Sequence, residues 1–112
     1  MIFHIVPQAI WSDAQSQAAY QPASLGTEGF IHCSTREQLL GSATLHFHGQ
    51  SHLVVLCIDE QRVAADIRYE NLTGGALLFP HIYGPLNADA IVDVLELPQT
   101  AAGAFYLPPQ LA

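Results

Sequence analysis

Leu53-Val54-Val55-Leu56-Cys57-Ile58 is the longest uninterrupted aliphatic run of the chain, and it sets the centre of the expected fold. Side chains alternate between the two faces of a strand, so residues 53, 55 and 57 share one face and residues 54, 56 and 58 the other. Both faces are apolar, which is typical of a strand inside a sheet rather than at its edge. We therefore expect this segment to be a central strand.

Shorter segments on either side complete the predicted fold. Further strands are predicted over residues 2–6, 30–33, 63–70, 77–83 and 90–97. Helices are predicted over residues 8–20, ended by Pro22, and from a capping box at Ser34 or Thr35 to about Phe47. Residues 24–28 are expected to form a loop. The order β-α-β-α followed by strands predicts an α+β fold with a mainly antiparallel or split sheet.

The composition is that of one well-buried domain spanning residues 1–112. Half of the residues are hydrophobic and only 12% are charged, against roughly 25% charged in average globular proteins. The tail, residues 98–112, carries Phe105, Tyr106 and Leu107 between prolines. It is too apolar to be a solvated tail, so we expect it to pack on the body.

The charge balance limits the classes of partner. The net charge is −7, and the cations are Arg36, Arg62 and Arg68. Binding to nucleic acid or to an anionic membrane surface usually needs several cations, so we expect neither DNA, RNA nor membrane partners. A small-molecule ligand, or a protein met through apolar contacts, remains open, as does the oligomeric state.

The cysteines and the N-terminus favour the cytoplasm. Cys33 and Cys57 are too few for a secreted disulfide framework, and both lie in apolar stretches. The first residues lack the basic start and cleavage site of a signal peptide. No apolar run is long enough to cross a membrane.

Three predicted strands carry one histidine each within an apolar frame: His4, His32 and His81. By strand alternation Ser34 shares a face with His32, and Tyr83 shares a face with His81. An unsatisfied buried imidazole costs about 1–3 kcal/mol, and a shared polar cleft would satisfy all three. We therefore expect them to converge; the alternative is that each is a hydrogen-bonded core residue.

Other polar and aromatic residues could complete such a cleft. Glu28 and Glu70 could each orient a histidine, bind a ribose hydroxyl or act as a general base. The alternative is a solvated carboxylate, with Arg68 as a surface partner of Glu70. Trp11 and Tyr20, near the ends of the first helix, are candidates for the cleft wall.

Metal and covalent chemistry are poorly supported. His46, His48 and His52 have a spacing like that of metal ligands, but no acid or cysteine completes the shell, so we expect no metal site. Cys33 points away from His32 on its strand, which leaves it without a base. A glycine-rich phosphate loop is also absent from the sequence.

Two long motifs and a short one resemble a known family. They are Ser24-Leu25-x-x-Glu28-Gly29-Phe30-Ile31-His32-Cys33-Ser34, Phe79-Pro80-His81-Ile82-Tyr83-Gly84-Pro85-Leu86 and Phe3-His4-Ile5. From His4 to about Leu97 the chain resembles the bacterial family catalogued as domain of unknown function 952. The resemblance implies an ADP-ribosyltransferase-like fold with the arrangement of the RNA 2′-phosphotransferase branch.

The resemblance also implies roles for individual residues. His4 and His32 would clamp NAD, with Ser34 beside the ribose and Tyr83 as a stacking partner. Glu70 would stabilise an oxocarbenium-like transition state, while His81 has no counterpart in that branch. The phosphotransferases use several arginines to hold phosphates, and this chain has only scattered ones, so transfer to or from RNA is not expected.

The resulting functional hypothesis is a histidine-lined cleft that binds or processes an NAD- or ADP-ribose-like nucleotide. Its catalytic candidates are His4, His32, Glu70 and His81. Its ligand-binding candidates are Trp11, Tyr20, Ser24, Glu28, Ser34 and Tyr83. The alternatives are a binding module without catalysis, and a structural dimer protein whose histidines belong to the core.

Overall fold

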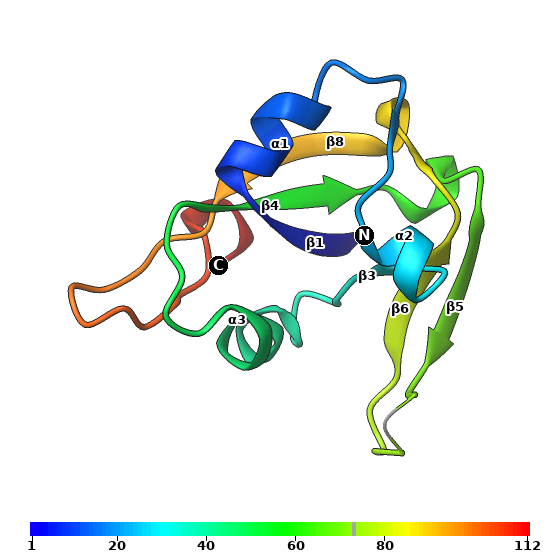
Figure 1. Cartoon of the computed structure of the whole chain (residues 1–112). Coiled ribbons are helices and arrows are strands. Elements are labelled where there is room, and N and C mark those ends of the chain that lie inside the picture. Colours follow the sequence, from blue (N-terminus) through cyan, green and yellow to red (C-terminus); the bar gives the residue numbers. More distant parts are fainter. Residues whose placement is uncertain (73) are drawn as a thin grey trace.

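The computed structural model describes residues 1–72 and 74–112 and shows an α+β fold (Figure 1). Its strands are β1 (Ile2–Pro7), β2 (Ala19–Tyr20), β3 (Ile31–His32), β4 (Leu53–Ile58), β5 (Asp66–Glu70), β6 (Phe79–Tyr83), β7 (Leu86–Asn87) and β8 (Ile91–Glu96). Its helices are α1 (Gln8–Ala14), α2 (Ser24–Thr27) and α3 (Leu39–Phe47), with 3₁₀ turns η1 (Glu60–Arg62), η2 (Ala88–Ala90) and η3 (Pro109–Leu111).

Strand β4 lies at the centre of the main sheet, as its sequence predicts. The strand order is β1-β4-β8, and both neighbours run antiparallel to β4. Phe3 lies opposite Cys57, and Val55 lies opposite Leu95. Every residue of β4 is buried, because side chains from each of its faces enter a hydrophobic core.

The two faces of this sheet support two separate cores. On one face, Ile2, Val6, Leu56 and Ile58 pack with Ile82 from the second sheet, and Trp11 and Ala14 of α1 pack against them. The other face carries a second core that includes α3 and part of the tail: Phe3, Ile5, Leu39, Ala43, Leu53, Val55, Cys57, Leu95 and Leu97. In Figure 1, α1 lies above the sheet and α3 below it.

Two smaller antiparallel sheets flank the main one. One has the order β3-β6-β5, and the other pairs β2 with β7. An isolated bridge between Phe3 and Ser34, with both backbone hydrogen bonds at 2.8 Å, joins β1 to the residues that follow β3. The prediction of an α+β fold with antiparallel, divided sheets is therefore confirmed.

The predicted helix over residues 8–20 is too long. α1 ends at Ala14, and its residues include none that is buried. Helices in proteins are stabilised mostly by packing of an apolar face, and α1 buries too little apolar surface to stabilise a longer helix. Tyr20 instead lies in an extended segment opposite Leu86, where its ring is buried.

Other boundaries also differ from the prediction. The expected loop at residues 24–28 contains the short helix α2, closed by Gly29 at φ 86°. The second long helix begins at Leu39, because Ser34 is held in the bridge to β1. The Thr35 backbone N–H donates to Gln38 Oε1 at 3.0 Å, so one bond of the predicted capping box forms in the turn before α3. The strand predicted from residue 63 begins only at Asp66, because the chain first forms the 3₁₀ turn η1.

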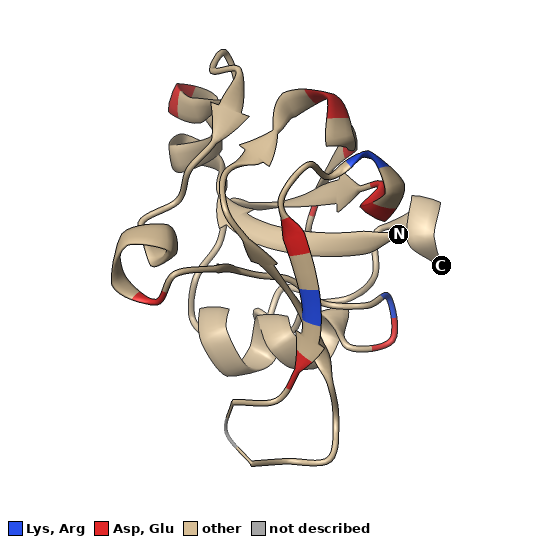
Figure 2. Ribbon diagram, turned by 90° about the vertical axis from the view of Figure 1, so that its right-hand side faces the viewer, with Lys and Arg blue, Asp and Glu red and all other residues tan. Residues whose placement is uncertain are grey.

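The tail lies against the second core. Phe105, Leu107 and Leu111 are partly buried against it, and Pro108 is fully buried. Figure 2 shows Asp and Glu spread over several elements, with few Lys or Arg between them. Within the part of the chain that the structure describes, no helix is long and apolar enough to cross a membrane.

Candidate functional site

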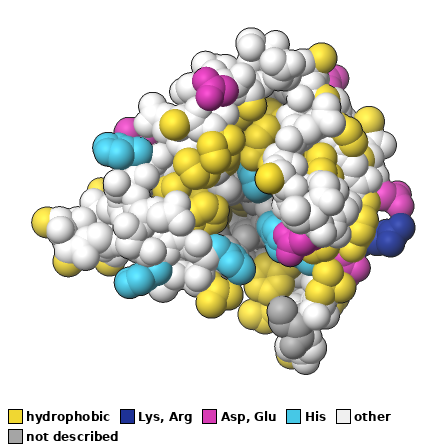
Figure 3. All heavy atoms as spheres, in the orientation of Figure 1, with side chains coloured by type: hydrophobic (Ala, Val, Ile, Leu, Met, Phe, Trp, Pro, Cys, Tyr) yellow, Lys and Arg dark blue, Asp and Glu magenta, His cyan; other side chains and the backbone are white. Residues whose placement is uncertain are grey.

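A cavity of about 530 Å³ lies beside strands β1, β3 and β6 and against α3. Figure 3 shows the hollow, with histidine and hydrophobic side chains around it. Its polar lining comes from His4, Ser24, His32, Ser34, Glu37, Gln38, Ser42, His46 and His81. Its apolar lining includes Phe3, Ile5, Pro22, Leu45, Phe47, Leu77 and Phe79.

Strand pairing brings the three strand histidines to this cavity. His32 of β3 lies directly opposite His81 of β6, and their ring centroids are 5.6 Å apart. Strand β6 pairs with one edge of β3, and the bridge from Phe3 to Ser34 brings β1 to the other edge. His4, the residue after Phe3, therefore lies close to His32. All three side chains line the same hollow.

His4 is the buried member, and both of its ring nitrogens are occupied. Nδ1 lies 2.6 Å from the His32 carbonyl oxygen, which only accepts, so Nδ1–H donates. Nε2 of the neutral ring then accepts from the Tyr20 hydroxyl at 2.8 Å. Burial lowers the pKa of His4 to about 4, and burial also raises the pKa of Tyr20. His4 is therefore uncharged at neutral pH and fixes the position of β3.

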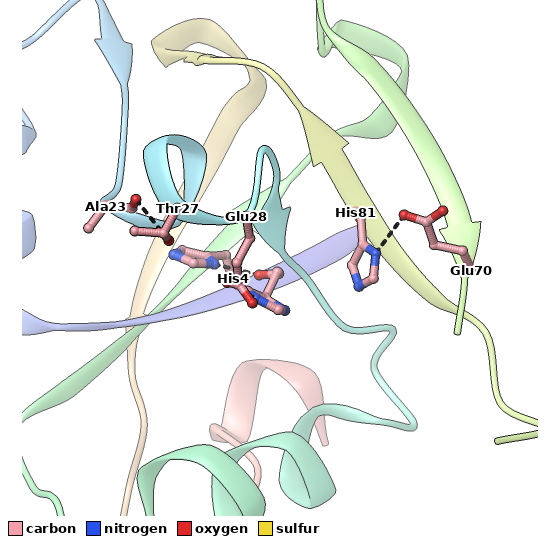
Figure 4. A network of polar contacts seen from close by, with 7 residues as sticks. His4, Ala23, Thr27, Glu28, Glu70 and His81 are labelled. Atoms are coloured by element: carbon pink, nitrogen blue, oxygen red, sulfur yellow. Dashed lines mark hydrogen bonds and ion pairs between the residues drawn. The ribbon is translucent and has the colours of Figure 1, made fainter. Parts of the chain in front are cut away.

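His81 has one nitrogen on a carboxylate and the other free for the cavity. Nδ1 lies 2.9 Å from Glu70 Oε1, and since a carboxylate only accepts, Nδ1–H donates. Among the described residues no group bonds Nε2. In Figure 4 that nitrogen points away from Glu70. The ring stacks on Phe30, with centroids 4.2 Å apart and planes 23° apart.

Glu70 is held as a carboxylate by two donors. The Tyr83 hydroxyl makes a short hydrogen bond to the same Oε1 that receives His81. The Tyr83 bond first, and then the His81 bond, hold the pKa of Glu70 below its usual range. The same contact raises the pKa of Tyr83. Tyr83 is not among the residues that line the cavity. It is connected to His81 through the Glu70 carboxylate that both side chains contact.

His32 forms a second imidazole–carboxylate pair at the mouth of the cavity. Its Nε2–H donates to Glu28 Oε2 at 2.7 Å, and both side chains are about half exposed, at 47% and 49%. Figure 4 shows Glu28 descending from the end of α2 toward His4. An exposed pair of this kind adds little to stability.

The remaining predicted residues are divided between the cavity and other places. Ser24 lines the cavity, and so does Ser34, whose Oγ lies 2.7 Å from Ser42 Oγ. Trp11 lines a separate cavity of about 160 Å³, together with Tyr20.

Arg68, the alternative surface partner of Glu70, makes its contacts with other residues. Arg68 lies 3.6 Å from Asp66 and stacks over the Tyr83 ring, with its guanidinium carbon 4.5 Å from the ring centroid. It stays close enough to help lower the pKa of Glu70. The alternative account, a surface ion pair between Arg68 and Glu70, is not among the contacts of the described residues: Arg68 contacts Asp66 and the Tyr83 ring.

Several site residues escaped the sequence analysis. Phe30 stacks on His81, a role that the sequence analysis did not indicate. His46 was weighed only as a metal ligand, yet its ring lies 6.2 Å from that of His32 on the cavity wall. Leu45 and Leu77 line the cavity although both are exposed, and no pattern marks them.

Two other chemistries have little support in the geometry. Burial raises the pKa of Cys33, which keeps its thiol protonated. Among residues 1–72 and 74–112, no group of three or more His, Cys, Asp or Glu side chains is arranged to hold a metal ion.

Comparison with known proteins confirms the family that the sequence motifs resemble. The pattern of the family described as "Protein of unknown function (DUF952)" matches residues 5–94, and the chain belongs to this family. The X-ray structure of protein CC0527 from Caulobacter crescentus is similar, with a TM-score of 0.85 and 32% identity over 98% of this chain and 96% of that one. The solution NMR structure of CC0527 has a TM-score of 0.78 and 33% identity, over 98% and 91% of the two chains. No curated protein matches the chain.

Proposed function

We propose that this DUF952 protein binds a small, nucleotide-like organic molecule in the histidine-lined cavity and exchanges a proton with it through His81. The observation that carries the proposal is the arrangement of His81. One ring nitrogen is fixed on the Glu70 carboxylate, and the other has no partner among the described residues and reaches the cavity. A histidine held in this way has a defined tautomer and a free proton acceptor.

Each residue of the site has a distinct role in this proposal. Nε2 of His81 accepts a proton from an O–H or N–H group of the ligand. The ring then carries a positive charge, which the adjacent Glu70 carboxylate stabilises. His32, paired with Glu28, is the second proton-carrying group, 5.6 Å from His81 between ring centroids. Because both nitrogens of His4 are bonded, His4 positions the backbone of His32.

The cavity favours an uncharged or cationic part of a nucleotide. Its volume falls within the 300–1,000 Å³ range that is usual for small-molecule sites. No Lys or Arg lines it in the described part of the chain, whereas Glu37 does, and the protein carries a net charge of −7. A diphosphate would find little positive charge here. The resemblance implies an NAD- or ADP-ribose-like ligand, and its nucleoside portion is the part that enters.

Binding without turnover is the second candidate function. The Ser34 hydroxyl is bonded to Ser42, and the Cys33 thiol is buried, so neither is an activated nucleophile. A protein with this site could keep the ligand without transforming it. The structural alternative, in which the histidines are fully satisfied core residues, fits His4 but leaves one ring nitrogen of His81 unexplained.

The test is a titration of isotope-labelled protein with adenosine, NAD and ADP-ribose, followed by amide chemical shifts. We expect adenosine to shift residues of β3, β6 and α3, with a smaller response to ADP-ribose at low ionic strength. His81→Gln should lose the response. His48→Gln is the matched control, because His48 is exposed and does not line the cavity. Unchanged spectra with all three compounds at millimolar concentration would overturn the proposal.

A further inference from the structure

We infer that Gly41 of α3 is a ligand-contacting residue of the cavity, where the missing side chain leaves room for a flat ring of the ligand to lie against the helix. The inference rests on the proposed function, in which this ring is the base of a nucleoside. It concerns the α3 wall of the cavity, to which the proposed function gives no role.

The backbone does not explain a glycine at position 41. Glycine is the poorest helix former after proline, because its backbone loses the most freedom on folding. Gly41 is nevertheless the third residue of α3. Its φ is not positive, so any residue could adopt its conformation, whereas a positive φ accounts for five of the eight glycines in the chain.

Packing within the protein does not explain this glycine either. Apart from its chain neighbours and its own helix backbone, a Cβ added at Gly41 would meet no atom of the described residues within 4 Å. At Gly84, by contrast, the Cβ of Ala65 would lie only 3.0 Å away. Gly41 lines the cavity. A side chain at this position would therefore extend into space that the protein leaves empty.

Longer side chains lie on either side of Gly41 along the cavity wall. Leu45 follows one helical turn later, on the same face of α3, and Glu37 lies in the turn that leads into the helix. All three residues line the cavity. A gap with backbone as its floor fits a flat ring, to which Leu45 offers an apolar contact. A carboxylate only accepts hydrogen bonds, so Glu37 favours a ring that carries an amino group, such as adenine.

The same cavity contains a buried polar group that needs a ligand. His81 is only 6% exposed, and its Nε2 has no partner in the described part of the chain. In Figure 4, α3 lies below the strand that carries His81, and Gly41 and His81 line one cavity. A nucleoside suits both positions, because its sugar hydroxyls and its base are separate parts of the molecule.

Gly41→Ala tests the inference, because alanine adds a single methyl group and is the best helix former. The variant should melt a few degrees higher than the native protein. Its affinity for adenosine, measured by amide chemical shifts, should nevertheless fall roughly tenfold or more, as one additional carbon in a tight site can cause. Gly41→Leu, with a longer side chain, should lose the response to millimolar adenosine.

Gly26→Ala is the matched control. Gly26 is also an exposed glycine in a helix, with open space where a Cβ would lie, but it is not among the residues that line the cavity. This variant should bind adenosine as the native protein does. A higher melting temperature together with weaker binding, seen only at position 41, is a combination that a purely structural role of Gly41 would not produce.

Each other outcome overturns the inference. Native affinity for adenosine in either Gly41 variant, or an equal loss in Gly26→Ala, would do so and leave the proposed function standing. A lower melting temperature of Gly41→Ala would show that the fold itself requires glycine there. If the native protein does not respond to adenosine, the inference fails, and the titrations with NAD and ADP-ribose decide separately whether the proposed function fails with it.

Discussion

The buried His4 should make the protein markedly less stable in mild acid. Its folded-state pKa is lowered from 6.5 to about 4, so the unfolded chain binds more protons than the folded one between these values. The contribution of the neutral His4 ring to stability is therefore fully present above pH 6.5 and is lost as the pH falls toward 4. For one buried group with this shift, the loss between neutral pH and pH 4.5 is roughly 2–3 kcal/mol.

The assay is urea unfolding at neutral pH and at about pH 4.5, compared between the native protein and His4→Gln. The glutamine keeps a hydrogen-bond donor and an acceptor but does not titrate. The variant should be less stable at neutral pH and should lose less stability on acidification. Other groups that titrate, including Glu70, remain in both proteins and cancel in the comparison. An identical loss of stability in both proteins would refute the assignment of His4 as a buried neutral ring.

Three further predictions follow from individual contacts. Tyr83→Phe removes the strongest donor to Glu70, so the pKa of that carboxyl should rise, as carbon-13 NMR titration would record; an unchanged value would show that the hydroxyl contact is unimportant. Cys33 and Cys57 are buried with raised pKa values, so a thiol reagent should modify them only on unfolding, and rapid reaction of the native protein would contradict their placement. Leu56→Ala should cost roughly 2–5 kcal/mol in chemical denaturation, since Leu56 is fully buried, and a loss below about 1 kcal/mol would argue against a close-packed core around β4.

The sequence predicted the features that depend on local alternation. β4 is central because both of its faces are apolar, and His81 and Tyr83 share a face because they are two residues apart on a strand. Convergence of the strand histidines followed from the free energy of burying imidazole. These arguments need no knowledge of how distant segments pair.

The rest depended on contacts between distant segments. Beyond the short helix α1, Tyr20 lies in an extended segment and reaches His4 across 16 residues of sequence, a contact that the helical pattern did not indicate. The assignment of Glu70 to His81 depends on the register of β5 against β6. The placement of Leu45 and Leu77 on the cavity wall depends on where α3 lies relative to β6. No sequence pattern determines such pairings.

The central claim concerns the protonation of the His81 ring, and nitrogen-15 NMR of the labelled side chain measures it most directly. Nδ1 of the neutral ring should show the chemical shift of a protonated nitrogen and Nε2 that of an unprotonated one, and only Nε2 should respond when adenosine is added. A ring protonated at Nε2, or one in which neither nitrogen responds to the ligand, would contradict the account.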